Sequence, residues 1–209
     1  MIKLGARELR ITKPTAGDLR KIKKNPIYIV LDNVLDTYNI GSIFRLADAV
    51  AAEKVFLCGE TQTPPNSRIK KASINTTEWV DWQYFETAKE AIEELRKKWK
   101  VGSEKLENEV RSGKSRVQEI PLQCPASHIS LHTSIHVIAV EQDPRSIPYT
   151  QMKVEFPLAI VVGNETTGIS KSALQTADEI VEIPMFGVNK SLNVMVSCAV
   201  VLFEAVEHL

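Results

Sequence analysis

The chain has 209 residues, of which 44% are hydrophobic and 25% are charged, and its formal net charge is zero. This composition is that of an ordinary soluble globular protein with one full core. The opening residues are too polar for an export signal, and the most apolar segment, 192–206, falls short of the roughly 20 residues that span a bilayer. We therefore expect a cytoplasmic protein that does not enter a membrane.

The zero net charge hides a basic N-terminal leader. Residues 1–24 carry eight Lys or Arg residues against two acidic residues, a local charge of +6 that leaves −6 for the rest of the chain. A basic leader on a slightly acidic body favours contact with phosphates. A solvated and partly frayed leader explains the same charges equally well.

Short β-branched runs alternate with helical patterns along the chain. The candidate strands are 27–31, 54–57, 135–140, 158–162 and 179–183. The candidate helices are 40–50, 87–98, 170–177 and 192–206. The run 158–162 is continuously apolar, which indicates burial on both faces. The pattern predicts a single-domain α/β sandwich in which helices cover a parallel sheet.

Residues 101–134 interrupt this alternation. A short turn is expected between the helix that ends near residue 100 and the strand at Ile135, and a long stretch without clear structure is uncommon in a compact domain. Its acidic and basic residues balance, so it is not a plain nucleic-acid-binding arm. We predict a surface excursion that is poorly ordered at least in part.

The excursion contains a pattern that resembles a metal site. Cys124, His128 and His132 lie in it, and His136 follows at the same spacing of four. That spacing aligns ligands only on a helix, whereas this segment is rich in β-branched and hydroxyl residues, so we predict no metal site. Cysteines are few, far apart and without a C-x-x-C pair, which predicts reduced thiols. They are Cys58, Cys124 and Cys198.

Three polar, glycine-bearing loops follow predicted strands. Ligands bind at the carboxyl edge of α/β sheets, so we expect the loops to build one composite site. The residues are Asn39, Gly41 and Arg45 in the first loop, Gly163, Glu165 and Gly168 in the second, and Ser191 and Asn193 in the third.

Some of these residues also have a purely structural interpretation. Asn39 is placed to cap the helix that follows it, and Ser191 is placed to cap the last helix. Arg45 has Asp48 and Asp32 as candidate ion-pair partners. Taken singly, each structural interpretation is the stronger one.

The glycines and the acidic residue of the second loop leave similar alternatives open. Gly163 and Gly168 can serve turn geometry alone, whereas Gly41 lets another group approach the first helical turn closely. Glu165 can accept hydrogen bonds from Asn39 or a ligand, or cap a neighbouring loop.

Together the three loops resemble the motifs of the SpoU branch of the SPOUT RNA methyltransferases, the TrmH-like ribose 2′-O-methyltransferases. The resemblance covers roughly residues 25–100 and 135–207. The stretch 70–80 also looks like the one that follows the second strand in this family. The matching patterns are Asn39-x-Gly41-x-x-x-Arg45, Gly163-Asn164-Glu165-x-x-Gly168, and Ile183-Pro184-Met185 followed by Ser191-Leu192-Asn193-Val194.

The resemblance implies the SPOUT fold, a parallel-sheet sandwich with a deep trefoil knot near the C-terminus, and a homodimer with active sites at the subunit interface. It also implies S-adenosylmethionine as cofactor, held largely by backbone groups. No G-x-G-x-x-G stretch follows a strand, which disfavours the ordinary dinucleotide and Rossmann methyltransferase folds. The cofactor-binding residues implied are Gly163, Ile183, Met185, Ser191 and Leu192.

The implied reaction is methyl transfer to a ribose 2′-hydroxyl of RNA, for which no metal is required. Arg45 would bind the adjacent phosphate and stabilise developing alkoxide charge, whether or not it accepts the proton itself. Asn39 and Glu165 would orient Arg45 and the ribose. Ser191 would bind a phosphate, and Asn193 would shape the loop between cofactor and acceptor.

We divide the chain into a basic leader, residues 1–24, and a SPOUT methyltransferase domain, residues 25–209, interrupted by the excursion at about 101–134. RNA capture would then fall to basic residues near the N-terminus and near residue 70, and transfer RNA is favoured over ribosomal RNA because the chain lacks the additional N-terminal RNA-binding domain of some ribosomal RNA members. These residues are Arg7, Arg10, Lys21, Lys23, Lys24, Arg68, Lys70 and Lys71. The alternatives are a catalytically idle RNA-binding or assembly protein that retains the knotted fold, and a base methyltransferase of the wider SPOUT group.

Overall fold

A parallel β-sheet forms the middle layer of the protein. The computed structural model describes residues 3–9, 11–111 and 134–209, and within these ranges the sheet has seven strands in the order β3-β2-β1-β6-β4-β7-β5. Every neighbouring pair is parallel. The strands are β1 Asn25–Asp32, β2 Ala52–Cys58, β3 Trp82–Phe85, β4 His136–Val140, β5 Ile147–Pro148, β6 Leu158–Gly163 and β7 Glu179–Glu182.

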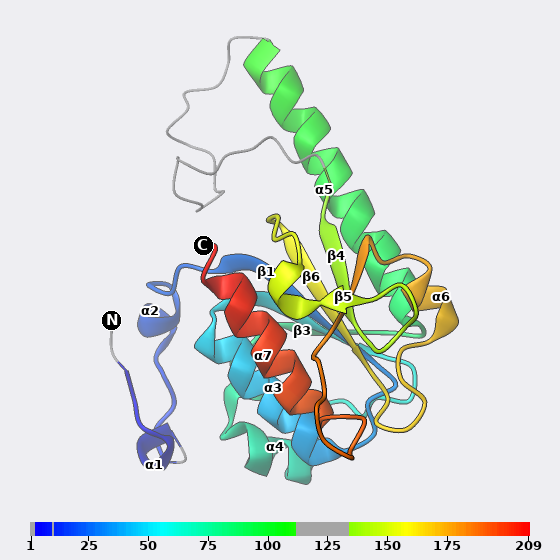
Figure 1. Cartoon of the computed structure of the whole chain (residues 1–209). Coiled ribbons are helices and arrows are strands. Elements are labelled where there is room, and N and C mark those ends of the chain that lie inside the picture. Colours follow the sequence, from blue (N-terminus) through cyan, green and yellow to red (C-terminus); the bar gives the residue numbers. More distant parts are fainter. Residues whose placement is uncertain (1–2, 10, 112–133) are drawn as a thin grey trace.

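Helices cover both faces of this sheet (Figure 1). On one face α3 (Thr37–Ala49) and α7 (Val194–Val206) lie together, with α4 (Ser67–Ser73) beside α3. On the other face lie α5 (Ala88–Arg111) and α6 (Lys171–Leu174). The remaining elements are α1 Ala6–Leu9, α2 Ala16–Leu19 and the 3₁₀ turns η1 Thr76–Glu78 and η3 Tyr149–Gln151.

The central strands are apolar because both of their faces are buried. In β1, Ile29 and Leu31 pack in the core beneath α3 and α7, whereas Tyr28 and Val30 pack in the core beneath α5. All four side chains are at most 1% exposed. Burial on two faces explains why the pattern of period two is absent from these strands. The predicted α/β sandwich with a helix-covered parallel sheet is thereby confirmed.

The elements that the sequence pattern missed lie at the edges or are short. β3 and β5 are the two edge strands of the sheet, and neither contains a fully buried residue. The helices α1, α2 and α4 have four, four and seven residues, too few for a clear helical period.

Helix α5 is longer than the sequence pattern predicted. It continues to Arg111 instead of ending near residue 100, so the first part of the predicted excursion is helical. In Figure 1 this end of α5 extends beyond the sheet. Residues 112–133, with Cys124, His128 and His132, lie outside the described residues, and their predicted disorder stays a prediction.

The two described thiols lie in the core. Cys58 and Cys198 are buried free thiols, as predicted. His136 is the first residue of β4, and no group of three potential metal ligands occurs among the described residues. Within the same residues, no helix combines the length and the apolar character needed to cross a membrane.

The described part of the leader is held against the body beside α4. The Asn75 side chain donates to the carbonyl of Leu9 at 3.0 Å, and Lys13 pairs with Glu78 of η1. Lys24 donates to the backbone carbonyl of Ala52 at 3.1 Å. The first two contacts place the leader beside the segment that follows α4, where Glu78 also pairs with Lys70 of α4.

Candidate active site

The loops that follow β1, β6 and β7 open at the same edge of the sheet. β1 and β6 are neighbours in register, with Asp32 paired to Gly163 at their carboxyl ends. β4 and β7 continue the sheet on the far side of β6. Parallel strands end at one edge, so the three loops meet there.

A chain of hydrogen bonds joins one polar side chain from each loop. The Asn39 amide donates to Glu165 Oε1 at 3.0 Å, and the Asn193 amide donates to Asn39 Oδ1 at 3.0 Å. Asn39 is only 7% exposed. Asn39 is more than 100 positions away from both Glu165 and Asn193 along the chain. The network therefore fixes the relative positions of all three loops.

Glu165 holds the first loop through its backbone as well. Its carboxylate accepts the N–H groups of Leu35 and Asp36, each at 3.2 Å. Partial burial alone would raise the pKa of the Glu165 carboxyl, but the hydrogen bonds from the Asn39 side chain and from these backbone amides outweigh it and lower the pKa below its ordinary value. Glu165 is therefore an anion tied to the start of α3.

The helix caps differ from those predicted. α3 begins at Thr37 and is capped by Asp36, which accepts the Tyr38 N–H at 2.8 Å. Asn39 thus lies inside the first turn, and the expectation that it caps the helix was wrong. The last helix is capped by Asn193, which accepts the N–H of Met195 at 3.0 Å, so Ser191 does not cap it.

Two glycines of the motifs allow close approaches within the fold. A Cβ on Gly41 would lie 2.6 Å from the Cβ of Ala72 and 2.7 Å from the carbonyl of Ile69, so the group that approaches the first turn is α4. A Cβ on Gly163 would lie 2.4 Å from the backbone of Gly168. Gly41 packs α3 on α4, and Gly163 lets the second loop fold back on β6.

One pocket lies among the ends of β4, β6 and β7 and the start of α7. Its lining includes every residue that the sequence assigned to cofactor binding, namely Gly163, Ile183, Met185, Ser191 and Leu192. Glu141, Glu165 and Glu182 also line it. The structure thus brings together residues from three loops around one concave surface.

Arg45 stands apart from this pocket. It is exposed on α3 and does not line the pocket of its own chain. The predicted ion pairs do not form, since Asp48 accepts the Trp79 indole N–H at 2.7 Å and Asp32 accepts the Ser170 N–H at 2.8 Å. Among the described residues the Arg45 side chain makes no hydrogen bond or ion pair, which leaves its guanidinium available to a ligand or a second chain.

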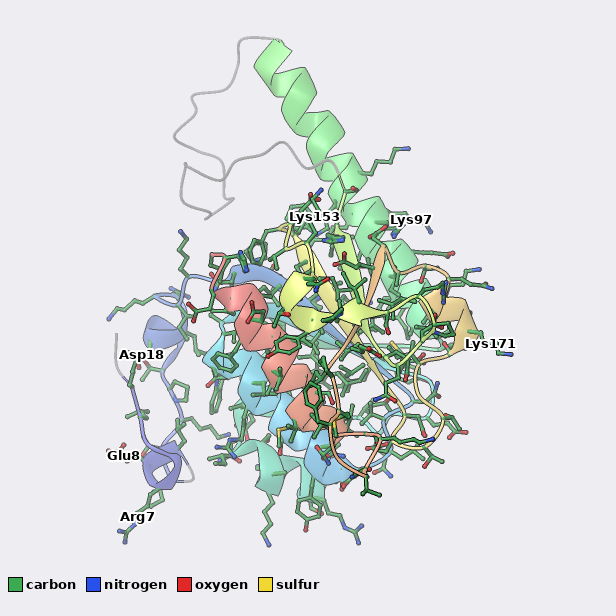
Figure 2. The ribbon with its side chains drawn as sticks, in the orientation of Figure 1. Arg7, Glu8, Asp18, Lys97, Lys153 and Lys171 are labelled. Carbon is green, nitrogen blue, oxygen red and sulfur yellow. The ribbon has the colours of Figure 1, made fainter. Side chains whose placement is uncertain are left out.

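The basic residues predicted to bind RNA divide into free and engaged ones. Arg7 on α1 is exposed and points away from the body in Figure 2. Lys70 pairs with Glu78 at 3.1 Å, and Lys24 is held by the carbonyl of Ala52. Arg10 lies outside the described residues. The other predicted residues are exposed: Lys21, Lys23, Arg68 and Lys71.

Sequence reasoning missed two acidic residues at this edge. Asp32, the last residue of β1, and Glu141, the first residue after β4, each accept a backbone N–H of the second loop. The only signal in the sequence is a carboxylate directly after an apolar strand, which is also common in ordinary turns.

The chain matches the model of a known protein family. The model of the SpoU rRNA Methylase family matches residues 26–126 and 126–203. The chain belongs to this family. The two matched stretches together span residues 26–203, contain all three loop motifs and meet at residue 126, within the predicted excursion.

Curated relatives of this SpoU domain act on two kinds of RNA. It is 28% identical over 193 residues to the 23S rRNA (guanosine-2′-O-)-methyltransferase RlmB of Vibrio cholerae, covering 91% of this chain and 63% of that protein. It is 29% identical over 180 residues to the tRNA (guanosine(18)-2′-O)-methyltransferase of Escherichia coli K12, covering 85% of this chain and 61% of that protein. The chain therefore spans less than two thirds of the length of these relatives.

Solved structures of two RNA-modifying enzymes share the fold. The AdoMet-bound rRNA methyltransferase of Sinorhizobium meliloti superimposes with a TM-score of 0.64 at 24% identity, covering 91% of this chain and 60% of that chain. The TrmH/SpoU tRNA-modifying enzyme of A. aeolicus gives 0.62 at 20% identity, covering 97% and 81%. At these identities the likeness establishes the common α/β architecture.

Proposed function

We propose that the chain transfers a methyl group from S-adenosylmethionine to a ribose 2′-hydroxyl of RNA. The observation that carries the proposal is the hydrogen-bonded chain from Glu165 through Asn39 to Asn193 beside the pocket. It joins the three loops whose motifs define the resemblance. Family membership and the 2′-O-methyltransferase names of the relatives support the same reaction.

The pocket has the chemistry that this cofactor needs. Its apolar side chains, Val162, Ile183 and Leu192 among them, suit an adenine ring, and the carboxylate of Glu182 suits a cationic ligand. S-adenosylmethionine supplies an electrophilic methyl group on a positively charged sulfur. Gly163, Ile183, Met185, Ser191 and Leu192 would hold it, largely through backbone groups.

The residues around the pocket would then bind and orient the acceptor. Arg45 would bind the phosphate next to the acceptor ribose and stabilise the developing negative charge on the 2′-oxygen. Asn39 and Glu165 would orient the ribose, Ser191 would bind a phosphate, and Asn193 would hold the third loop against the first. No step requires a metal ion.

The position of Arg45 favours a homodimer as the active form. Arg45 is exposed and lies outside the pocket of its own chain, so it would serve the pocket of a second copy. An apolar face on the same side of the sheet offers an interface: Val196 and Phe203 of α7 are 38% and 46% exposed, and Tyr38 of α3 is 53% exposed. Val196 and Phe203 are seven residues apart and share one helix face.

The C-terminal trefoil knot is part of the same proposal. β6 lies between β1 and β4, although β4 precedes it in the chain, and β7 lies on the far side of β4. This interleaving of the last strands, with α7 returning over the sheet next to α3, supports the proposal of a threaded C-terminus.

The deciding experiment is methyl transfer to defined RNA. The purified chain is incubated with labelled S-adenosylmethionine and with unmodified transfer RNA or ribosomal RNA transcripts, and the RNA is digested to nucleosides. Label in 2′-O-methylnucleosides supports the proposal, and label in the bases indicates a base methyltransferase. RNA binding without transfer indicates the idle RNA-binding protein. We expect transfer RNA to be the better acceptor. The basic leader beside α4 would contact either RNA through its phosphates.

A further inference from the structure

The loop that carries Glu165 is held by two carboxylates from the strands on either side of β6. Asp32 at the end of β1 accepts the N–H of Ser170 through Oδ2 at 2.8 Å. Glu141 after β4 accepts the N–H of Ile169 through Oε2 at 2.8 Å. β1 and β4 both pair with β6, so the two bonds reach consecutive amides of the loop from opposite sides.

Both carboxylates are fully engaged in these contacts. The second oxygen of Glu141 accepts the N–H of Gln142 at 3.0 Å, and that of Asp32 accepts the Asn33 side-chain amide at 2.8 Å. Asp32 is only 1% exposed. Hydrogen bonds from amides to an anion are stronger than those between neutral groups, and a buried carboxylate depends on them.

Gly168 makes the approach of Glu141 possible. Its φ is +70°, and a Cβ at this position would lie 2.2 Å from Glu141 Oε2. The carboxylate therefore sits directly over the backbone of the loop. A side chain at position 168 would displace it.

Backbone hydrogen bonds within the loop couple the position of residues 169 and 170 to that of Glu165. Asn164 and Gly168 exchange both of their backbone hydrogen bonds, at 3.1 and 3.0 Å. Glu165 lies inside this closed turn, and its carboxylate reaches the amides of Leu35 and Asp36 at the start of α3. Movement at residues 169 and 170 would therefore move Glu165 relative to α3.

We propose that Asp32 and Glu141 form a carboxylate clamp that positions the 164–170 loop, and with it Glu165, against the start of α3. They are positioning residues, because they act through backbone amides of the loop. The catalytic consequence of the clamp rests on the proposed methyl-transfer function. The structural consequence does not, because it concerns only how the loop is held in the unliganded chain.

Amide hydrogen exchange tests the clamp without any activity. In Glu141→Ala, the N–H groups of Leu35 and Asp36 should exchange faster by on the order of tenfold, although neither contacts Glu141. The amide of Val30 in β1 should keep its protection, which shows that the fold is intact. Unchanged exchange at Leu35 and Asp36 in Glu141→Ala overturns the proposal. Glu141→Gln, which retains one acceptor oxygen, should give a smaller increase.

Glu179 supplies a matched control. Its carboxylate also accepts a backbone N–H, that of Lys153 at 2.9 Å, but it lies at the first residue of β7, the opposite end from the site. Glu179→Ala should accelerate exchange at Lys153 and leave Leu35 and Asp36 as they were. Faster exchange at Leu35 and Asp36 in both variants would indicate a general loss of stability and would overturn the proposed clamp.

A double-mutant cycle tests the catalytic consequence. Glu141→Ala should lower methyl transfer by at least about tenfold in the wild-type background and change it little in the Glu165→Ala background, because the clamp acts through Glu165. Equal fold losses in both backgrounds would overturn the positioning role. If the wild-type chain transfers no methyl group to RNA, the proposed function fails, and hydrogen exchange still decides the clamp.

Discussion

Arg45 and Glu165 differ in how the single chain holds them. Glu165 is fixed by the Asn39 amide and by two backbone N–H groups, whereas Arg45 has no partner among the described residues. Ordering an arginine side chain costs conformational entropy. A guanidinium without a partner in the free protein is therefore ordered only when it binds a ligand or a second chain. Glu165 therefore belongs to the structure of the site, whereas the role proposed for Arg45 is to contact a ligand.

Arg45→Ala should lower methyl transfer by roughly a hundredfold or more, because it removes the group proposed to stabilise developing charge on the acceptor oxygen. Affinity for S-adenosylmethionine, measured by calorimetry, should remain nearly intact. Arg45→Lys keeps the charge without the planar fork and should recover only part of the rate. Parallel loss of affinity and rate would instead make Arg45 a wall of the cofactor pocket.

Glu165→Gln should destabilise the protein in a pH-dependent way. The pKa of Glu165 lies below its ordinary value of 4.5, so its anion contributes stability that is present above that value and lost as the pH falls through the lowered folded-state pKa. The difference in melting temperature between wild type and Glu165→Gln should be largest at neutral pH and shrink as acidification protonates Glu165 in the folded protein. A difference that does not vary with pH would show that the charge of Glu165 is not what the network uses.

At the scale of elements, α3 joins the site to the core. Its first turn carries Asn39. Gly41, two residues later, packs closely against α4, because it has no side chain. A displacement of α3 on α4 would move Asn39 relative to Glu165. The packing of these two helices and the geometry of the site are therefore coupled.

Gly41→Ala should destabilise the protein by about 1–3 kcal/mol, because the added Cβ would lie 2.6 Å from the Ala72 Cβ and 2.7 Å from the Ile69 carbonyl. Denaturant unfolding measures the loss. Gly187→Ala is the matched control, since a Cβ there meets nothing within 4 Å and should cost little. Equal effects of the two substitutions would refute the close-packing role of Gly41.

The sequence predicted the elements that are buried on both faces and missed those at the margins. The apolar run 158–162 forms nearly the whole of β6, whereas β3 and β5 are short and half-exposed. The three site loops were found because their motifs are local. Asp32 and Glu141 were missed because their partners, Ser170 and Ile169, are 138 and 28 residues away and contribute only backbone amides.

At the scale of the whole molecule, the exposed apolar face of α7 and the position of Arg45 together predict that methyl transfer depends on dimerisation. Replacing Val196 and Phe203 by Glu should convert a dimer to a monomer in sedimentation experiments, because a charge in an apolar interface is costly. Methyl transfer should fall with dissociation, since Arg45 would no longer reach a partner's pocket. Ile11→Glu is the control, because Ile11 is 85% exposed on the leader. A fully active monomer would contradict the proposed role of Arg45 across the interface.

The leader and α4 together form the basic surface that would hold RNA. Glu78 pairs with both Lys13 and Lys70, so these two segments stay adjacent while Arg7, Arg68 and Lys71 remain exposed. Phosphate contacts release counterions, and each contact adds about 0.7–0.9 to the slope of log affinity against log salt. Deleting residues 1–20 should therefore flatten this slope and weaken RNA binding most at low salt. An unchanged slope would exclude the leader from RNA binding and leave only α4 and its surroundings to capture the substrate.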